Sequence, residues 1–110
     1  MTSVKFLADE KGLYGFTISG HSSVNCDDEI GKIVCSAVSS AAYLTANTVT
    51  DVIGDNAQID VRDGFMSFRV DSPTEGTYQL MDGLKLHLTQ LSEEYSNNIR
   101  IYGGAKHVKD

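Results

Sequence analysis

The first third of the chain alternates between apolar and polar positions in two short runs. Residues 4–8 place apolar side chains at every second position, and residues 13–19 alternate again. A period of two is typical of a half-buried strand. A polar turn ending in Gly12 separates the runs, so the pattern predicts a β-hairpin. Gly20 ends the second strand, and His21 follows it in a loop position, where functional side chains are common.

The spacing of apolar residues becomes helical after this loop. Residues 33–53 repeat apolar side chains every three or four positions, which predicts a helix of about five turns. Gly54 follows, and glycine is favoured just past a helix C-terminus. The predicted apolar stripe contains Val34, Val38, Ala41, Thr45, Val49 and Val52, widened by Ala37, Leu44 and Thr48.

The second half repeats the order of strand, strand and helix. Residues 57–61 and 65–70 are short alternating runs around an Asp-Gly pair at 63–64, a strong hairpin signal. Residues 77–95 then have a leucine-rich face at helical spacing, and residues 99–102 form a possible last strand. The order β-β-α-β-β-α predicts a two-layer α+β fold with both helices on one face of a small sheet. We expect one domain over residues 1–110.

Composition restricts the partners and the cellular compartment that we expect for this domain. The formal charge of −6 argues against direct binding of nucleic acid, since phosphate contacts need clustered Lys and Arg. No apolar run is long enough for a membrane span or a signal peptide. Two cysteines without a secretion signal indicate a reducing compartment and free thiols, so we expect a cytoplasmic protein. The spacing of Cys26 and Cys35 leaves a disulfide between them open.

Cys35 and His21 are the residues with the clearest potential for chemistry. We expect Cys35 in or near the first turn of the long helix, where the helix dipole favours a thiolate. His21 lies fourteen residues earlier and is the candidate proton carrier. Ser39 lies one turn after Cys35 on the same helix face. A cysteine beside apolar neighbours is also a common buried core residue, so spacing alone leaves both readings open.

Two segments carry a resemblance to a known family. Gly20-His21 and the run GKIVCSAVS at residues 31–39 resemble the ribosomal-processing cysteine protease family called Prp. The resemblance extends over the hairpins and both helices. It implies that Cys35 is the nucleophile and that His21 is the general base and acid. Ser39 would be a supporting residue at the site.

The same resemblance implies a substrate and an assembly. Family members remove the N-terminal extension of a ribosomal protein precursor, protein twenty-seven of the large subunit, by cutting after an aromatic-containing motif. They are homodimers, and the loop between the histidine and the cysteine closes over the substrate. No cofactor is implied.

This chain departs from the family pattern near the cysteine. Many relatives have an aspartate two or three residues before it, where this chain has Lys32 and Ile33. Asp27 or Asp28 could take over an orienting or substrate-binding role, or could complement the start of the helix. The backbone N–H of Cys35 is a candidate oxyanion donor.

Two alternatives remain at this stage. One is a non-catalytic ribosome-associated binding module of the same fold. The other is a thiol redox site or a zinc site built from His21, Cys26 and Cys35, which lacks a paired CxxC motif and a fourth ligand. We therefore expect no metal. His87 and His107 are weaker candidates for function.

Overall fold

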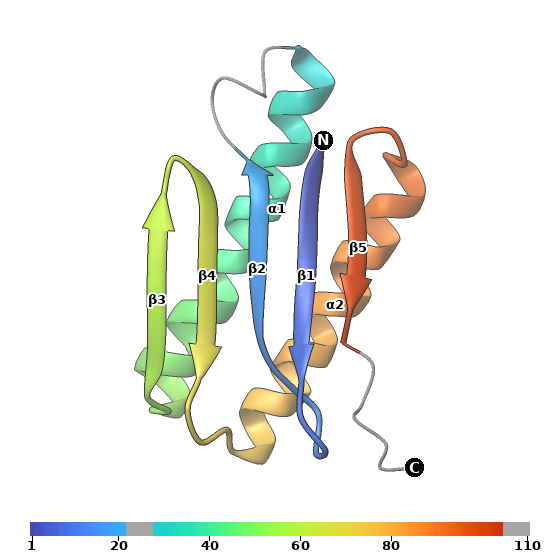
Figure 1. The fold of residues 1–110 in the computed structure, drawn as a ribbon. Helices are drawn as coiled ribbons and strands as arrows, with labels where there is room; N and C mark the ends of the chain where they lie inside the picture. Colours follow the sequence, from blue (N-terminus) through green and yellow to red (C-terminus); the bar gives the residue numbers. More distant parts are fainter. Residues whose placement is uncertain (22–27, 105–110) are drawn as a thin grey trace.

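The computed structural model describes residues 1–21 and 28–104, with His21 described by its backbone only. The expected order of elements is confirmed, and a fifth strand closes the chain (Figure 1). The elements are β1 (Thr2–Ala8), β2 (Leu13–His21), α1 (Glu29–Asn47), a π-helical extension η1 (Thr48–Ile53), β3 (Ala57–Arg62), β4 (Gly64–Val70), α2 (Glu75–Glu94) and β5 (Ile99–Gly103).

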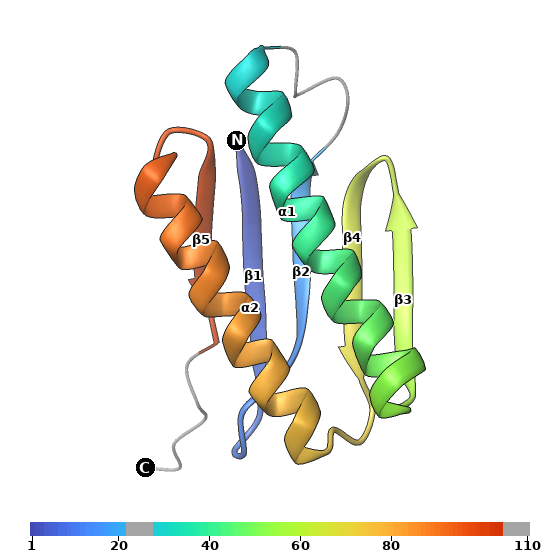
Figure 2. The same ribbon diagram turned by 180° about the vertical axis from the view of Figure 1, so that it is seen from behind.

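The five strands form one sheet in the order β3-β4-β2-β1-β5. All neighbouring pairs are antiparallel except β1 and β5, which are parallel. Helix α2 carries the chain back across the sheet before β5, as a parallel connection requires. Both helices lie on the same face of the sheet, as Figure 2 shows from the helix side. The predicted two-layer architecture is therefore correct.

The core lies between this face of the sheet and the two helices. Three phenylalanines from neighbouring strands form its centre, with ring centroids 6.4 Å apart for Phe6 and Phe16 and 5.5 Å apart for Phe16 and Phe68. The helices cover them with fully buried side chains, among them Val38 and Leu88. Alternation along each strand places these residues on one face, as expected. Within the described residues, neither helix is long and apolar enough to cross a membrane.

Helix α1 begins earlier than the sequence pattern indicates. Asp28 is its N-cap, and the Asp28 carboxylate accepts a hydrogen bond from the Gly31 N–H at 2.5 Å. The predicted start at residue 33 was wrong because the first turn carries no buried apolar residue: its one large apolar side chain, Ile30, is 51% exposed. The end at Gly54 is confirmed, with φ at +91°.

The predicted stripe on α1 is correct at its start and wrong towards its end. Val34, Val38, Thr45 and Val49 are buried, whereas Leu44 and Val52 are exposed; Ala42 and Ala46 are buried instead. The helix changes to π geometry at residues 48–53. A π-helical turn has more residues than an α-helical turn, so Val52, within this segment, no longer follows a 3.6-residue period. Leu44, Ala42 and Ala46 lie before the segment, in regular α-helix.

Candidate active site

The Gly-His pair lies at the end of β2, and the backbone explains the glycine. Gly20 has φ of +76°, and a Cβ at this position would lie 2.4 Å from the Met1 carbonyl oxygen. The register shifts between Ser19 and His21, which places His21 opposite Gly64 at the start of β4. Only glycine combines this backbone angle with this close approach. Gly20 thus allows the irregularity that brings His21 beside the β3–β4 hairpin.

Cys35 lies deeper in α1 than expected. It is the seventh residue of the helix and is half-buried, between buried Val34 and the turn carrying buried Val38. The dipole effect falls off within the first turn, so the helix start does not provide the expected stabilisation of a thiolate here. An N–H at this depth is used within the helix, so the Cys35 N–H is also a poor oxyanion donor. Both corrections follow from the N-cap at Asp28.

The structure holds the Cys35 sulfur in a disulfide. The expectation of free thiols is therefore wrong for Cys35 in this structure. The only other cysteine in the sequence is Cys26, which lies outside the described residues. A thiolate is the nucleophilic form of cysteine, so Cys35 must be reduced before it can attack a substrate.

Ser39 lies one turn below Cys35 and lines a small pocket with Tyr43, a further turn along α1. The remaining lining residues come from β2 and the β3–β4 hairpin: Ile18, Val61, Arg62, Asp63, Gly64, Phe65 and Met66. The pocket volume is about 140 Å³, below the ~300 Å³ at which pockets for drug-sized ligands begin. Its size and mostly apolar walls suit one side chain of a peptide.

This pocket lies between the backbone segments that carry the two expected catalytic residues. Cys35 precedes Ser39 by one helical turn, and His21 is the register partner of Gly64, which lines the pocket on the strand side. Sequence reasoning missed Tyr43 and the hairpin residues. The only local signal was the Asp-Gly turn, and it indicates a hairpin without saying which helix the hairpin approaches.

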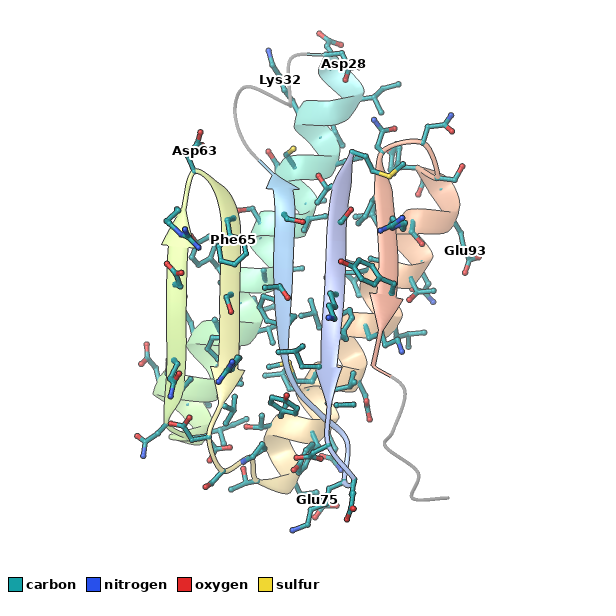
Figure 3. All side chains as sticks on the ribbon, viewed as in Figure 1. Asp28, Lys32, Asp63, Phe65, Glu75 and Glu93 are labelled. Atoms are coloured by element: carbon teal, nitrogen blue, oxygen red, sulfur yellow. The ribbon has the colours of Figure 1, made fainter. Side chains whose placement is uncertain are left out.

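Of the two aspartates expected to assist the site, the structure describes only one. Asp28 caps α1 and is exposed, whereas Asp27 lies outside the described residues. Figure 3 shows Asp28 and Lys32 at the start of α1, at the same end of the molecule as Asp63 on the hairpin. Lys32 and Ile33, where the family resemblance leads to the expectation of an aspartate, are both exposed, and neither has a carboxylate.

The zinc alternative receives no support from the described part of the chain. No group of three His, Cys, Asp or Glu residues there is close enough to hold a metal ion. Cys26 and the His21 side chain lie outside the described part of the structure. His87 is exposed on α2 and lines a separate groove, and His107 lies outside the described residues.

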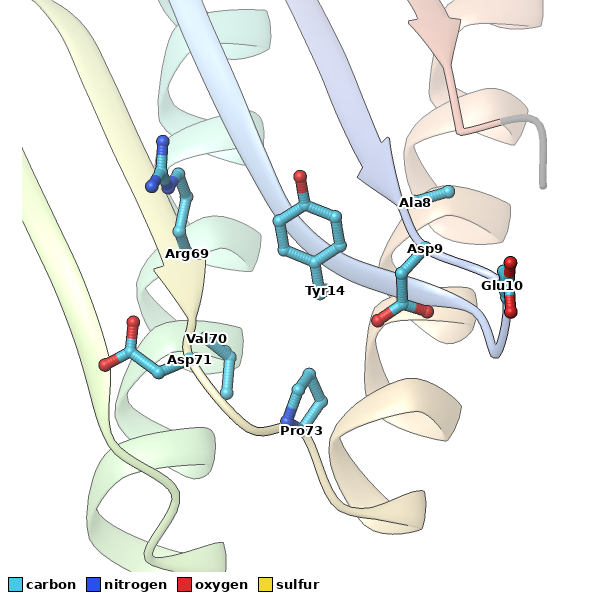
Figure 4. A pocket seen from close by; sticks show the side chains of 8 residues that line it. All are labelled: Ala8, Asp9, Glu10, Tyr14, Arg69, Val70, Asp71 and Pro73. Atoms are coloured by element: carbon cyan, nitrogen blue, oxygen red, sulfur yellow. The ribbon is translucent and has the colours of Figure 1, made fainter. Parts of the chain in front are cut away.

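A larger cavity lies at the opposite end of the sheet from His21. Its volume is about 550 Å³, and Figure 4 shows the eight lining residues: Ala8, Asp9, Glu10, Tyr14, Arg69, Val70, Asp71 and Pro73. None of them is a cysteine or histidine. The smaller pocket is the candidate active site because its Ser39 lies one helical turn from Cys35 and its Gly64 pairs with His21.

Comparison with known proteins shows which family this chain resembles. A family model described as cysteine protease Prp matches residues 1–100. A search of curated proteins found no significant match. Among solved structures, SMU.848 from Streptococcus mutans is 21% identical with a TM-score of 0.81, and the match covers 97% of this chain and 99% of that one.

Two structures of a ribosomal processing protease from S. aureus share the fold. The essential protease Prp in complex with a substrate peptide is 17% identical with a TM-score of 0.84. The same protease with a covalently linked product peptide is 20% identical with a TM-score of 0.81. Each match covers 94% of this chain and 99% of the relative. Because the family model spans nearly all of the sequence, this chain belongs to the cysteine protease Prp family.

Proposed function

We propose that the chain is a cytoplasmic endopeptidase that removes the N-terminal extension of a large-subunit ribosomal protein precursor, protein twenty-seven of that subunit. The observation that carries this proposal is the arrangement of the family motif around one pocket. Cys35 and Ser39 follow one face of α1, and His21 pairs with Gly64 on the other side of the pocket. The S. aureus relatives, solved with a substrate peptide and with a covalently linked product peptide, support the substrate class and a covalent step.

The proposed reaction begins with the reduced Cys35. His21 takes the proton of the thiol, and the thiolate attacks the carbonyl carbon of the scissile peptide bond. The tetrahedral intermediate collapses when His21 returns the proton to the leaving amine, and an acyl thioester remains on Cys35. A water molecule that gives a proton to His21 then hydrolyses the thioester and restores the thiol. Because Cys35 lies beyond the first helical turn, His21 carries most of the thiol activation.

The pocket beside Ser39 would receive one side chain of the precursor. The family resemblance implies a cut after an aromatic-containing motif, and Ile18, Tyr43 and Met66 offer apolar walls to such a ring. Ser39 supports the site from the helix face. Asp28 acts here through the helix start that it caps, and Asp27 is proposed to contact the basic part of the substrate.

We also propose a homodimer. The family resemblance supports it, and an apolar groove between α1 and α2 offers a surface. The groove has a volume of about 550 Å³ and is lined in part by Ala37, Ala41, Leu44 and Leu80. Leu44 is 68% exposed in the single chain. Leu44→Asp should convert a dimer into a monomer in sedimentation velocity; a wild-type chain that is monomeric at high concentration would contradict this assembly.

The test of the function is cleavage of the extended precursor by the reduced protein, with the products identified by mass spectrometry. Cys35→Ala and His21→Ala should each reduce kcat/KM by at least about a thousandfold while the far-UV circular dichroism stays unchanged. Ser36→Ala, an exposed neighbour on α1, is the matched control and should cut at the wild-type rate. Cleavage by Cys35→Ala at the wild-type rate would overturn the mechanism. Retention of the precursor without any product would favour the non-catalytic binding module.

A further inference from the structure

The face of the sheet opposite the helices is open. Within the described residues, no helix covers it, as Figures 1 and 2 show from the two sides. The strand registers align its side chains in three rows across the sheet. The rows are Arg62, Phe65, Ser19, Ser3 and Arg100; then Asp60, Ser67, Thr17, Lys5 and Tyr102; then Gln58, Arg69, Gly15 and Leu7. We call these residues the open face.

The charge of the open face is opposite to that of the chain. It carries four of the nine lysines and arginines, Lys5, Arg62, Arg69 and Arg100, and one carboxylate, Asp60. The whole chain has a formal charge of −6, so the acidic excess lies on the helices, loops and turns. All four cations are exposed, and Arg62 is paired with Asp60 at 3.1 Å, which leaves Lys5, Arg69 and Arg100 as the unneutralised charges of the face. A partner of negative charge is attracted to this face and repelled elsewhere.

Two aromatic rings lie among these cations, on β4 and β5. The Arg62 guanidinium lies 4.6 Å from the centre of the Phe65 ring, and the Arg100 guanidinium lies 4.9 Å from that of Tyr102. Figure 3 labels Phe65 on β4, on the side of the sheet away from the helices. Between the two pairs, β2 and β1 carry the hydroxyl side chains of Ser19, Thr17 and Ser3, and β1 also carries Lys5. Three strand spacings separate β4 from β5, roughly 14 Å.

We propose that the open face binds single-stranded RNA. Arginine and lysine contact the phosphates, and an exposed ring of a sheet, here Tyr102 at 41% exposure, stacks on an unpaired base. Sheet surfaces recognise single strands by this combination. An acidic peptide would use the cations without using the rings. A second copy of this chain related by a two-fold axis would place cations against cations. The expectation of no direct nucleic-acid contact rested on the net charge and on the need for clustered Lys and Arg, and the strand registers bring four of these residues onto one face.

The location of the face links this proposal to the proposed function and, in that respect, rests on it. The row of Arg62 and Phe65 is adjacent to the pairing of Gly64 with His21. RNA bound on the open face would therefore lie next to the active site. A precursor already attached to RNA would then be a better substrate than the free precursor.

The direct test is fluorescence anisotropy with a labelled ten-nucleotide single-stranded RNA of mixed sequence. If all four cations contact phosphates, the affinity should fall about fiftyfold between 50 and 200 mM salt, from a slope of roughly −0.7 per contact. The triple variant Lys5→Gln, Arg69→Gln, Arg100→Gln should lose at least about tenfold in affinity at 50 mM salt. Its salt slope should become shallower by about two.

A charge-matched control separates the open face from net charge. Lys11→Gln, Lys32→Gln, Lys85→Gln removes three cations that lie off this face, and should change the affinity less than about twofold. Tyr102→Ser should weaken binding about fivefold or more if a base stacks on the ring. Equal losses in the two triple variants, or no binding at 1 mM RNA and 50 mM salt, would overturn the proposal. The proposal would also be overturned if polyglutamate bound as tightly as RNA and Tyr102→Ser had no effect. The open face would then be a general polyanion-binding surface.

Cleavage of the free precursor, measured without RNA, tests the proposed function independently of RNA binding. Lys5, Arg69 and Arg100 do not line the pocket beside Ser39, so their triple variant should cut the free precursor at the wild-type rate. It should lose the preference for precursor presented with RNA. Failure of RNA binding with normal cleavage would reject this inference alone.

Discussion

The two ends of the sheet differ in how their polar groups are used. At the end that carries the β1–β2 turn, Asp9 accepts hydrogen bonds from the Tyr78 hydroxyl at 2.8 Å and from the backbone N–H groups of Lys11 and Gly12. At the end that carries His21, the described part of the pocket is mostly apolar. The end with the dense hydrogen bonding holds the fold together, and the other end carries the proposed active site.

The ionisable groups with shifted pKa values lie at the end that carries the β1–β2 turn, which we call the anchored end. Burial raises the pKa of Tyr78 to about 12, assisted by its hydrogen bond to Asp9. The hydrogen bond from Thr77 lowers the pKa of Asp55, with help from Thr74. The larger cavity of Figure 4 lies there too. Shifted pKa values and cavity size are common guides to active sites. Here they lie at the opposite end of the sheet from the proposed active site, and the shifted groups hydrogen-bond between separate elements.

The sharpest difference between the ends should come from oxidation. With Cys35 in a disulfide, the protein should be inactive, since no thiolate can form. Addition of a dithiol reductant should raise the rate of precursor cleavage by at least about a hundredfold. The measurement is the initial rate before and after reduction, with the thiol content followed by mass spectrometry.

Cys26→Ser is the matched variant for this experiment. It removes the only other cysteine of the chain, so it should cut at full rate without reductant. If Cys26→Ser also needed reductant, or if the oxidised wild-type protein cut the precursor, the disulfide would not control Cys35. A normal rate for the reduced variant would also argue against a metal or redox site that depends on Cys26.

The sequence predicted elements whose pattern is local. The β3–β4 hairpin follows from alternation around Asp63 and Gly64, and Gly64 has the positive φ, +79°, that such a turn uses. Gly54 marks the end of the helical segment for a similar reason. The start of α1 was missed because an exposed cap leaves no apolar period. Asp28 acts through a single side-chain hydrogen bond.

Contacts between distant segments were less predictable. The parallel pairing of β5 with β1 depends on where α2 returns the chain, which no residue of β5 encodes. For the site, the family motif supplied Cys35 and His21, but the pocket beside Ser39 arises from the register of β2 against β4. The sequence pattern does not distinguish Tyr43 from other residues of the helix, and only tertiary packing places it beside the hairpin.

Two tyrosines allow the ends to be compared directly. Tyr43 lines the pocket at the end that carries His21, and Tyr14 lines the cavity at the anchored end. Tyr43→Ala should lower kcat/KM for the precursor about tenfold, because one apolar wall of the substrate pocket is lost. Tyr14→Ala should leave kcat/KM unchanged below its unfolding temperature. Equal losses in both variants would mean that the pocket beside Ser39 does not bind the substrate.

Asp55 should affect stability without affecting cleavage. Its carboxylate accepts hydrogen bonds from the Thr74 N–H and hydroxyl and from the buried Thr77 hydroxyl, the last at 2.6 Å. Asp55→Ala should lower the free energy of unfolding by about 1–3 kcal/mol, since Thr77 is left without its acceptor. Asp51→Ala, at an exposed position in η1, should change it by less than about 0.5 kcal/mol. Urea denaturation measures both variants.

The same carboxylate sets an acid limit on stability. The pKa of Asp55 is lower in the folded chain than the value near 3.9 of an unfolded chain. Its contribution is therefore present above about pH 4 and is lost as the pH falls through the folded pKa. The stability difference between wild type and Asp55→Ala should shrink between pH 4 and pH 2. A difference that stays constant over this range would show that the charged form is not what Thr77 stabilises.

The smallest expected effect is the alkaline limit set by Tyr78. Its folded pKa of about 12 lies above the unfolded value near 10, so the neutral phenol is favoured by folding. This contribution is complete below about pH 10 and is lost as the pH rises through 12. The melting temperature of the wild type should fall over that interval, and Tyr78→Phe should fall less steeply. Asp9→Asn should lessen the fall only in part, because burial still disfavours the phenolate. Parallel curves for wild type and Tyr78→Phe would contradict this role and leave the anchored end dependent on Asp55 alone.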